Sequence, residues 1–423
     1  MHRFTTALVG LALIPSASLS AQTLRSKVSD LFRFGECGEA LCLQVNAAVH
    51  GLHYVPSASV ASGAILDFFT RAIGLSVSSI PISSSSSGIA FSFGGGAPVQ
   101  TSVSSGPIFA ERSQTLGRNR MLVGGNVTAM SFKTFRGLPL DEMVFNFPHQ
   151  NVGNPTYGDP DFENDVIQVR AKLDLSLLVT TVFVNYGLLD NVDVAVAIPF
   201  VRTSLSGESF GEVLPFGATT PHFFGTPGAQ SLTATGSTEG SSVGVGDLAA
   251  RVKIGLVQGD SSGFALFGDA RLPTGDEEEF LGAGDWSMRA LAIYSARHGG
   301  FSPHVNAGAV IRGGDRNNGL LATVGFDQLI SRAFTLAIDA IGEYQLSDNE
   351  VDIPEPVQIT APFARTVVPT NLPGAKDHLV HTAIGVRYSR PNGLAALVNA
   401  LIPIKAGSLQ PRVAWTAGLE FSF

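Results

Sequence analysis

Apolar and polar residues alternate with a period of two along most of the chain beyond Arg120, as in strands that have one apolar and one polar face. The end of the chain shows this most clearly. From Trp415 to Phe423, one face carries only apolar side chains, namely Trp415, Ala417, Leu419, Phe421 and Phe423. The opposite face carries Thr416, Gly418, Glu420 and Ser422. An apolar face backed by a polar one predicts a strand that separates lipid from a wet interior.

The alternation recurs in twelve segments. They cover residues 119–135, 165–187, 192–204, 246–257, 264–272, 285–297, 302–312, 318–328, 334–345, 378–388, 393–403 and 411–423. Connections after the odd-numbered segments are mostly long, and those after the even-numbered segments are tight; the long ones span 137–164, 205–245, 273–284 and 346–377. Bacterial outer-membrane barrels have short periplasmic turns and longer external loops. The chain is therefore predicted to be an all-β, transmembrane antiparallel barrel.

The same rhythm places both ends of the barrel in the periplasm and requires an even number of strands. We expect about twelve. Counts from ten to fourteen remain open, because segment 165–187 can be split into a hairpin near Ser176 and two odd-numbered connections are short. The long connection 205–245, rich in Gly, Thr and Ser, is predicted to be mobile.

Charged residues gather on the polar face of these segments. A lipid-facing Arg or Lys at the membrane midplane costs about 2–4 kcal/mol, so we expect the charged face to point inward. The predicted lumen-lining residues are Arg170, Lys172, Asp174, Asp193, Arg251, Lys253, Asp269, Arg289, Arg312, Asp339, Glu343, Arg387, Arg412 and Glu420. Segment 285–297 fits less well, because Leu291 and Ile293 share the face of Arg289.

The first residues predict a secretory signal peptide over residues 1–21. His2 and Arg3 precede an apolar run to Ile14, and small residues follow up to a cleavage site near Ser20 or Ala21. No later stretch reaches the roughly 18 uncharged apolar residues of a transmembrane helix. The final strand resembles the terminal strand by which outer-membrane barrels are recognised for insertion, and this assigns Trp415, Leu419, Phe421 and Phe423 to the insertion signal.

Residues 22–118 differ in texture from the predicted barrel, residues 119–423. A Ser/Gly-rich stretch runs from Ser76 to Ser105, and residues 64–73, which include Phe68 and Phe69, can form a short amphipathic helix. Two interpretations remain open. The segment either folds into the lumen as a plug or forms a periplasmic or mobile extension, since Ser/Gly-rich chain loses much entropy on ordering.

Cys37 and Cys42 are the two cysteines of the chain, and the signal peptide directs them to an oxidising compartment. We therefore expect a local disulfide. The alternative adds His50 and His53 to form a Cys2His2 metal site, but the spacing departs from the usual zinc pattern. No metal and no other cofactor is therefore predicted.

Two acidic clusters lie in predicted loops, one at Asp159, Asp161, Glu163 and Asp165 and the other over 276–279. Such clusters can bind calcium or cation-bridged lipopolysaccharide, but neither has the ligand spacing of a calcium-binding hand, and we favour a solvated loop for both. The net charge of −8 argues against nucleic acid as a partner. The expected partners are outer-membrane lipid and lipopolysaccharide, the barrel assembly machinery and a small-molecule solute.

A lipid-modifying enzyme would need a serine coupled to a histidine on the barrel wall. His304, His378 and His381 are available, but none lies in a motif that couples it to a nucleophile. We therefore predict no catalytic residue and no enzymatic activity.

One stretch before the first segment reads Gly-Pro-Ile-Phe-Ala-Glu-Arg-Ser-Gln-Thr-Leu-Gly-Arg over 106–118. Gly-Val-Gly-Asp-Leu-Ala-Ala-Arg-Val-Lys follows over 244–253 and Leu-Pro-Thr-Gly-Asp over 272–276. In this order they resemble the outer-membrane family of phenol-degradation meta-pathway proteins, often called transporters. The resemblance implies a barrel that passes small aromatic or hydrophobic compounds. It carries over no site residues.

Twelve strands lie between the roughly eight of a side-chain-filled barrel and the 16–18 of an open channel, so a narrow or plugged pore is expected. We predict a passive channel or transporter for small, hydrophobic solutes in the bacterial outer membrane. The alternatives are a structural or surface-interaction barrel with a closed lumen and, less favoured, the enzyme. The inward charges fit both a selective path and a salt-bridged seal.

Overall fold

The computed structural model describes residues 22–34, 91–92, 99–100, 110–148, 164–217, 222–226, 228–314, 316–347, 355–374, 376–405 and 407–423. This part of the chain is almost entirely β-strand, with one short helix, α1 (Leu24–Asp30). No helix within it is long and apolar enough to cross a membrane. The predicted signal peptide, helix 64–73 and the sites at Cys37, Cys42, His50 and His53 lie outside the described residues.

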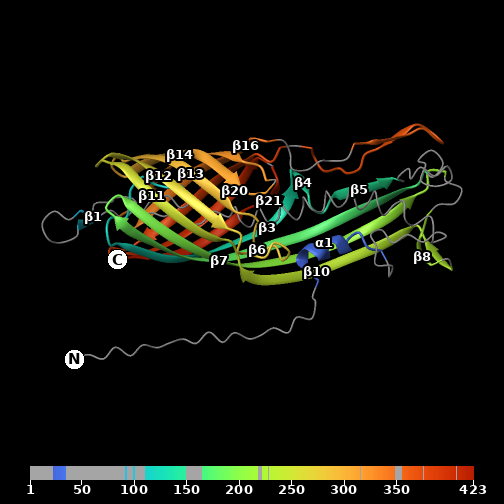
Figure 1. Ribbon diagram of the computed structural model, residues 1–423, viewed down its shortest axis with the longest axis horizontal. Coiled ribbons are helices and arrows are strands. Elements are labelled where there is room, and N and C mark those ends of the chain that lie inside the picture. Colours follow the sequence, from blue (N-terminus) through green and yellow to red (C-terminus); the bar gives the residue numbers. More distant parts are fainter. Residues whose placement is uncertain are drawn as a thin grey trace, which may run out of the picture.

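Twelve strands close into one antiparallel barrel, as the sequence predicts (Figure 1). They are β3 (Met121–Phe135), β6 (Val166–Leu189), β7 (Val192–Leu214), β11 (Leu248–Gln258), β12 (Ser262–Leu272), β13 (Ser287–Ala296), β14 (Phe301–Arg312), β15 (Gly319–Leu329), β16 (Phe334–Gln345), β19 (Leu379–Ser389), β20 (Leu394–Lys405) and β22 (Ala414–Ser422). Each corresponds to one predicted segment. The barrel closes where β22 pairs with β3, and Met121 and Phe423 exchange backbone hydrogen bonds of 2.9 Å.

The barrel has two unlike ends. The tight connections, such as Asp190 and Asn191 between β6 and β7, lie at the end that holds Phe423, here named the C-terminal end. The long connections lie at the opposite end, here named the long-loop end (Figure 1). This arrangement agrees with the alternation of connection lengths along the sequence.

At the long-loop end, β6 and β7 continue past the barrel and form a four-stranded extension (Figure 1). β5 (Met143–Pro148) pairs with the first part of β6, and β10 (Thr233–Val245) pairs with the second part of β7. The prediction of a mobile loop over 205–245 is therefore wrong in its larger part. The Gly, Ser and Thr of β10 give no strong apolar pattern, but the backbone pairs from Thr233 with Glu212 to Val245 with Phe200.

Short strands complete the described chain. They are β1 (Phe91–Ser92), β2 (Val99–Gln100), β4 (Leu138–Pro139), β8 (Phe224–Thr226), β9 (Ala229–Ser231), β17 (Val357–Ile359), β18 (Arg365–Val367) and β21 (Leu409–Pro411). β17 and β18 form a hairpin within the predicted loop 346–377, and Asn146 of β5 donates a backbone hydrogen bond to the Pro369 carbonyl after that hairpin. The long connections are thus partly ordered by pairing with one another.

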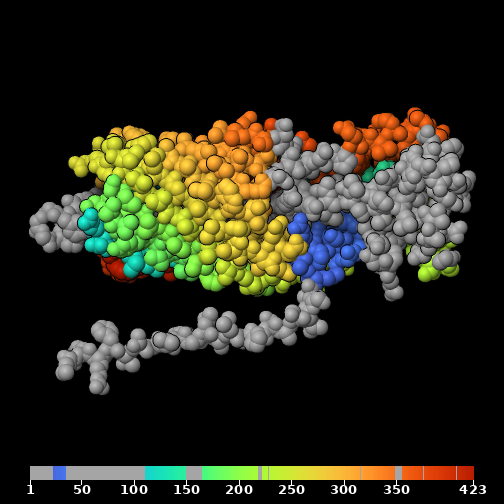
Figure 2. Space-filling model, viewed as in Figure 1, coloured from blue at the N-terminus to red at the C-terminus, as the bar shows by residue number. Residues whose placement is uncertain are grey.

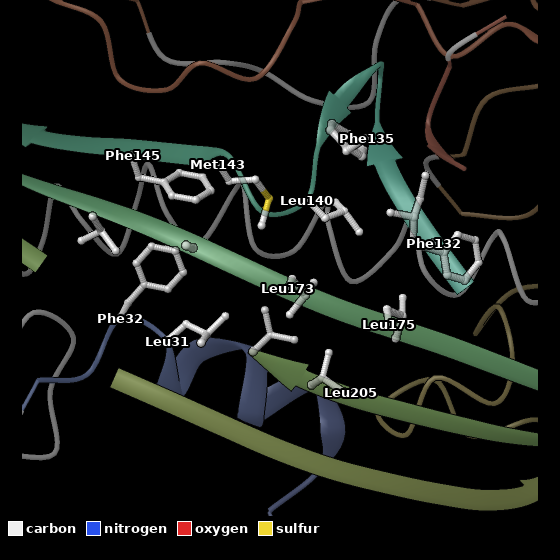
Figure 3. Packing of buried hydrophobic residues seen from close by; sticks show 14 of the residues in the cluster. Leu31, Phe32, Phe132, Phe135, Leu140, Met143, Phe145, Leu173, Leu175 and Leu205 are labelled. Carbon is white, nitrogen blue, oxygen red and sulfur yellow. The ribbon is translucent and has the colours of Figure 1, made fainter. Parts of the chain in front are cut away.

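α1 packs on the concave side of the extension, on the side opposite the charged face of β6. Thr23 caps the helix, because its Oγ1 accepts a hydrogen bond from the Ser26 N–H at 3.2 Å. Leu31 and Phe32 then meet the apolar side of β6 and β5 (Figure 3). The ring of Phe32 lies 5.2 Å from that of Phe145, edge to face. In the space-filling view, the blue α1 segment lies beside the yellow residues at the end of the barrel (Figure 2).

Two glycines allow α1 to lie close to strands β7 and β10. A Cβ at Gly240 of β10 would lie 2.7 Å from the Leu24 side chain, and one at Gly207 of β7 would lie 3.1 Å from Leu31. Close approach of backbone and helix therefore excludes side chains at these two positions. Residues 22–34, the first that the structure describes, are thus fixed at the long-loop end, not beside Phe423.

The outer face of the barrel changes polarity along the strands. On β6, every second residue from Leu178 to Leu188 faces outward; Val182 and Val184 are 45% and 41% exposed. This length matches the roughly 9–11 residues of a transmembrane strand. The apolar belt ends at a row of serines that pair across four strands: Ser131, Ser176, Ser204 and Ser241. Beyond this row, the outer face is polar.

Three predicted lumen residues lie beyond the serine row, and their inward assignment is wrong. Arg170, Lys172 and Asp174 are exposed on the outer face of the extension, whereas the alternate residues of β6 are buried against α1 and β5. Water, not lipid, surrounds this part of β6, so its polar face is the outer one. Arg412 is also exposed, in a bend before β22, and does not line the lumen.

The apolar belt generates a prediction on the outer face of β7. Val196 is 52% exposed within the belt, and we expect Val196→Arg to lower the free energy of unfolding by about 2–4 kcal/mol, because the charge meets lipid. Ser204→Arg, on the same strand and face at the serine row, should cost at most about 1 kcal/mol. Urea unfolding in vesicles, followed by tryptophan fluorescence, measures both. Equal losses would contradict the proposed membrane boundary.

Candidate functional site

The C-terminal half of the lumen is occupied by the chain itself. The segment before β3, residues 110–116, runs inside the barrel toward the C-terminal end. Its Leu116 N–H donates to the Asp193 carboxylate at 2.9 Å, and the Ser113 and Ser295 hydroxyls are hydrogen-bonded at 2.5 Å. These contacts join the segment to β7 and β13. We name residues 110–116 the lumen segment.

Two ion pairs hold Glu111 and Arg112, near the start of the lumen segment. Glu111 Oε2 lies 2.6 Å from Lys253 Nζ, and both side chains are almost fully buried. Arg112 pairs with Asp327 of β15. Because both pairs are withdrawn from water, each charge depends on its partner for stabilisation. The lumen segment is therefore held by charge as well as by hydrogen bonds.

Further buried charges join the strands around the lumen segment. The His304 ring lies between two carboxylates: its Nε2 is 2.7 Å from Asp339, and its Nδ1 is 3.6 Å from Asp327. Arg387 pairs with Glu420 between β19 and β22. Within the described residues, this half of the lumen is a connected, ion-paired interior rather than an open pore.

The long-loop half of the lumen contains a cavity of about 240 Å³. The lumen segment contributes Glu111 to its lining, and Ala283 and Asp285 of the β12–β13 connection and Ser408 beside β21 contribute at the long-loop end. Residues from the eight barrel strands from β11 to β20, together with β3 and β22, complete it. The cavity is thus a compartment of the lumen on the long-loop side of the lumen segment.

One wall of the cavity is basic. Arg251, Arg271 and Arg289 come from three adjacent strands and converge on the buried carboxylate of Asp269. Arg251 Nε and Arg289 Nη2 each donate to Asp269 Oδ2 at 2.9 Å, and Arg271 Nε is 3.5 Å from Oδ1. Strand register produces the cluster, since Asp269 lies directly between Arg251 and Arg289. We name these three arginines the arginine cluster.

Two more arginines line the cavity, each in an ion pair with an acidic residue. Arg312 Nη2 lies 2.6 Å from Glu343 Oε1, and Arg316 Nε lies 3.4 Å from Asp285. The arginine cluster differs from these pairs, because its three guanidinium groups approach one carboxylate.

The remaining wall is apolar. It carries Met130, Phe132, Leu291, Leu321, Ile341, Leu379, Leu401 and Leu409. Leu291 shares the inner face of β13 with Arg289, so the exception in the sequence pattern of this strand corresponds to a cavity-lining side chain. The compartment therefore presents both guanidinium groups and hydrocarbon to whatever enters it.

The structure places the predicted lumen residues in two groups. Asp193, Lys253, Asp339, Arg387 and Glu420 are buried in the C-terminal half. Arg251, Asp269, Arg289, Arg312 and Glu343 lie in or behind the cavity wall. The predicted insertion residues Trp415, Leu419, Phe421 and Phe423 are exposed on the outer face of the last strand.

Several site residues escaped the sequence interpretation. Arg271 and Asp327 lie on predicted strands, an even number of positions from other inward-facing residues. The period-two alternation could therefore have predicted that both side chains face the lumen. Glu111 and Arg112 lie in the stretch that carries the family resemblance, where no period of two exists. Their inward position depends on partners far away in the sequence.

The three histidines considered for catalysis have other contacts. His304 faces carboxylates with both ring nitrogens. His378 accepts a backbone hydrogen bond from Gln345 and stacks on Tyr344 at 4.2 Å. Desolvation, with the ammonium groups of Lys405 and Lys376, lowers the pKa of His378, which precedes its membrane strand. His381 lines the cavity.

The acidic clusters are partly engaged by the protein. Glu277 and Glu278 lie 3.3 Å and 2.8 Å from Arg25 of α1. Asp165 pairs with His222 at 2.9 Å, while Asp159, Asp161 and Glu163 lie outside the described residues. Within the described residues, no group of three or more His, Cys, Asp or Glu side chains is placed to hold a metal ion.

A family model described as "Putative MetA-pathway of phenol degradation" matches residues 160–359 and confirms the resemblance expected from the sequence. No curated protein matches the chain. An outer membrane channel from Pseudomonas putida F1 shares 10% identity over 74% of this chain and 98% of its own, with a TM-score of 0.44. A Pseudomonas aeruginosa FadL homologue shares 10% identity over 73% and 90%, with a TM-score of 0.30. These likenesses concern the fold.

The buried pair between Glu111 and Lys253 generates a stability prediction. We expect Lys253→Met to lower the free energy of unfolding by about 3–5 kcal/mol, because Glu111 is left buried without its cation. Glu111→Gln combined with Lys253→Met should recover part of that loss. Urea unfolding of the refolded barrel, followed by tryptophan fluorescence, measures the double-mutant cycle.

Lys133 is the matched control, since its pair with Asp174 at 3.3 Å is exposed on both sides. Lys133→Met should change the free energy of unfolding by no more than about 1 kcal/mol. A loss at Lys253 as small as the loss at Lys133 would show that the lumen segment is not anchored by this pair.

Proposed function

We propose that the protein is a passive channel of the bacterial outer membrane for small hydrophobic solutes, aromatic compounds included. The observation that carries the proposal is the cavity of about 240 Å³ inside a closed barrel, with eight large apolar side chains in its lining, Met130 and Leu401 among them. A hydrophobic solute gains free energy by leaving water for such a wall. The apolar outer belt supports a position in the membrane.

The family description supports the class of solute. Phenol is a small aromatic compound, and the matched residues 160–359 include the strands that carry the arginine cluster. The exposed Trp415, Leu419, Phe421 and Phe423 support contact with outer-membrane lipid and recognition by the barrel assembly machinery. The polar outer face beyond the serine row fits contact with lipopolysaccharide.

The lumen segment gives the channel its gate. It fills the C-terminal half of the lumen, so a solute in the cavity reaches that end only when residues 110–116 shift. On this basis we take residues 110–118, the described end of the predicted 22–118 region, as a plug of the lumen. Solute passage then depends on breaking the contacts of Glu111, Arg112 and Ser113 with the wall.

A barrel with a permanently closed lumen is the second candidate. The buried pairs Arg112–Asp327 and Glu111–Lys253 favour it, because separating either pair inside the lumen is costly. An enzymatic function has less support. Both ring nitrogens of His304 face carboxylates, an arrangement that leaves no base for activating a serine.

A disulfide lock separates a gated channel from a closed barrel. Ser113 Oγ and Ser295 Oγ are 2.5 Å apart, so Ser113→Cys with Ser295→Cys can link the lumen segment to β13. We expect the reduced double variant to conduct ions in planar bilayers and to admit radiolabelled phenol into intact cells. Oxidation should remove most of both activities, and reductant should restore them.

The parent protein, treated with the same oxidant and reductant, controls for Cys37 and Cys42. Each single cysteine variant controls for the substitutions. If the reduced full chain neither conducts nor raises phenol uptake above cells without the protein, the closed barrel is the correct description. If the locked variant passes phenol as well as the reduced one does, the lumen segment is not the gate.

A further inference from the structure

The arginine cluster gathers three guanidinium groups around one carboxylate. Arg251, Arg271 and Arg289 share the carboxylate of Asp269, and Asp247 also acts electrostatically on Arg271. Like charges in a partly desolvated lumen repel one another, and an additional anion bound beside them relieves that repulsion.

One member of the cluster is open to the cavity. The Arg289 side chain is 28% exposed, whereas those of Arg251 and Arg271 are 5% and 8% exposed. Arg289 uses Nη2 for Asp269, and its guanidinium carries further donors in a planar fork. Such a fork matches the two oxygens of a carboxylate.

The rest of the cavity selects what is attached to that carboxylate. Leu291 lies two residues along β13 from Arg289, and Leu321, Ile341 and Leu401 line the same cavity from β15, β16 and β20. An anion with an apolar body satisfies both sides at once. The volume of about 240 Å³ is larger than the roughly 150 Å³ that holds a benzene ring.

We propose that the cavity is a binding site for small amphipathic carboxylates, with the carboxylate on Arg289 and the apolar body against the leucine and isoleucine wall. The proposal rests on the proposed function, since it names the class of solute that the channel binds most tightly. Aromatic monocarboxylates of one ring are the representative ligands. An inorganic anion satisfies the arginine cluster but leaves the apolar wall in water.

Calorimetric titration of the full-length, detergent-solubilised protein tests the site. The probes are benzoate, its neutral isostere benzamide, and acetate, which has the charge without the ring. We expect benzoate to bind at least tenfold more tightly than either of the other two. Arg289→Gln should weaken benzoate binding by tenfold or more, the loss of a charge-assisted hydrogen bond, and change benzamide binding by less than about twofold.

Arg289→Lys keeps the charge and removes the fork, so benzoate affinity should fall between those of the parent and Arg289→Gln. Arg170→Gln is the matched control, because Arg170 also pairs with one acidic residue, Glu212, but lies on the outer face of the extension. It should bind benzoate like the parent. Two independent variants at position 289 keep the test valid if one of them does not fold.

Equal affinity of the parent for benzoate and benzamide would overturn the proposal, as would equal losses for both in Arg289→Gln. Acetate binding as tightly as benzoate would also overturn it, because the apolar wall would then contribute nothing. The proposed function is tested separately by phenol uptake. Phenol uptake without benzoate preference would refute only the carboxylate site, and benzoate preference without phenol uptake would refute only the channel.

Discussion

The structure depends on the need to satisfy every backbone hydrogen-bonding group of the membrane strands within the chain, because lipid offers no partner. Pairing of β22 with β3 closes the ladder and leaves no free edge in the belt. Closure then gives each strand one face toward lipid and one toward the lumen. Since charge on the lipid face is costly, most charged residues of the membrane strands are directed inward, and Arg202, which faces outward, lies at the edge of the belt beside the serine row. The apolar belt and the charged lumen are thus two consequences of one constraint.

The long strands β6 and β7 show that the same alternation serves two environments. Between Leu178 and Leu188, the outer face of β6 is apolar and meets lipid. Beyond the serine row at Ser176, the outer face is polar and meets water, while the inner face becomes the apolar support of α1. The polarity of both faces changes at the row. This extension fixes α1 at the long-loop end, where Arg25 reaches the β12–β13 connection.

The sequence predicts the barrel strands well, because period-two alternation between turns is a local signal; residues 334–345 correspond to β16 without error. It does not predict the environment of each face, and for that reason Arg170 and Lys172 were assigned inward. The seven residues of the lumen segment have no period of two, and Arg112 meets Asp327 across 215 positions of sequence. For the arginine cluster, the alternation places Arg251, Asp269 and Arg289 on one face. Only strand register makes them neighbours.

The lumen divides into two zones with different charge arrangements. Around the lumen segment, Glu111 has Lys253, Arg112 has Asp327 and Arg387 has Glu420, so each charge is matched and the zone is rigid. In the cavity, three arginines gather around the carboxylate of Asp269, and Arg289 is open to whatever enters. The cavity lies toward the long-loop end and the ion-paired zone toward the C-terminal end. A solute from the long-loop side therefore meets the selective surface before it meets the barrier. Binding therefore precedes gating. A ligand held by the arginine cluster lies in the cavity that Glu111 also lines, and Glu111 is near the start of the segment that has to move.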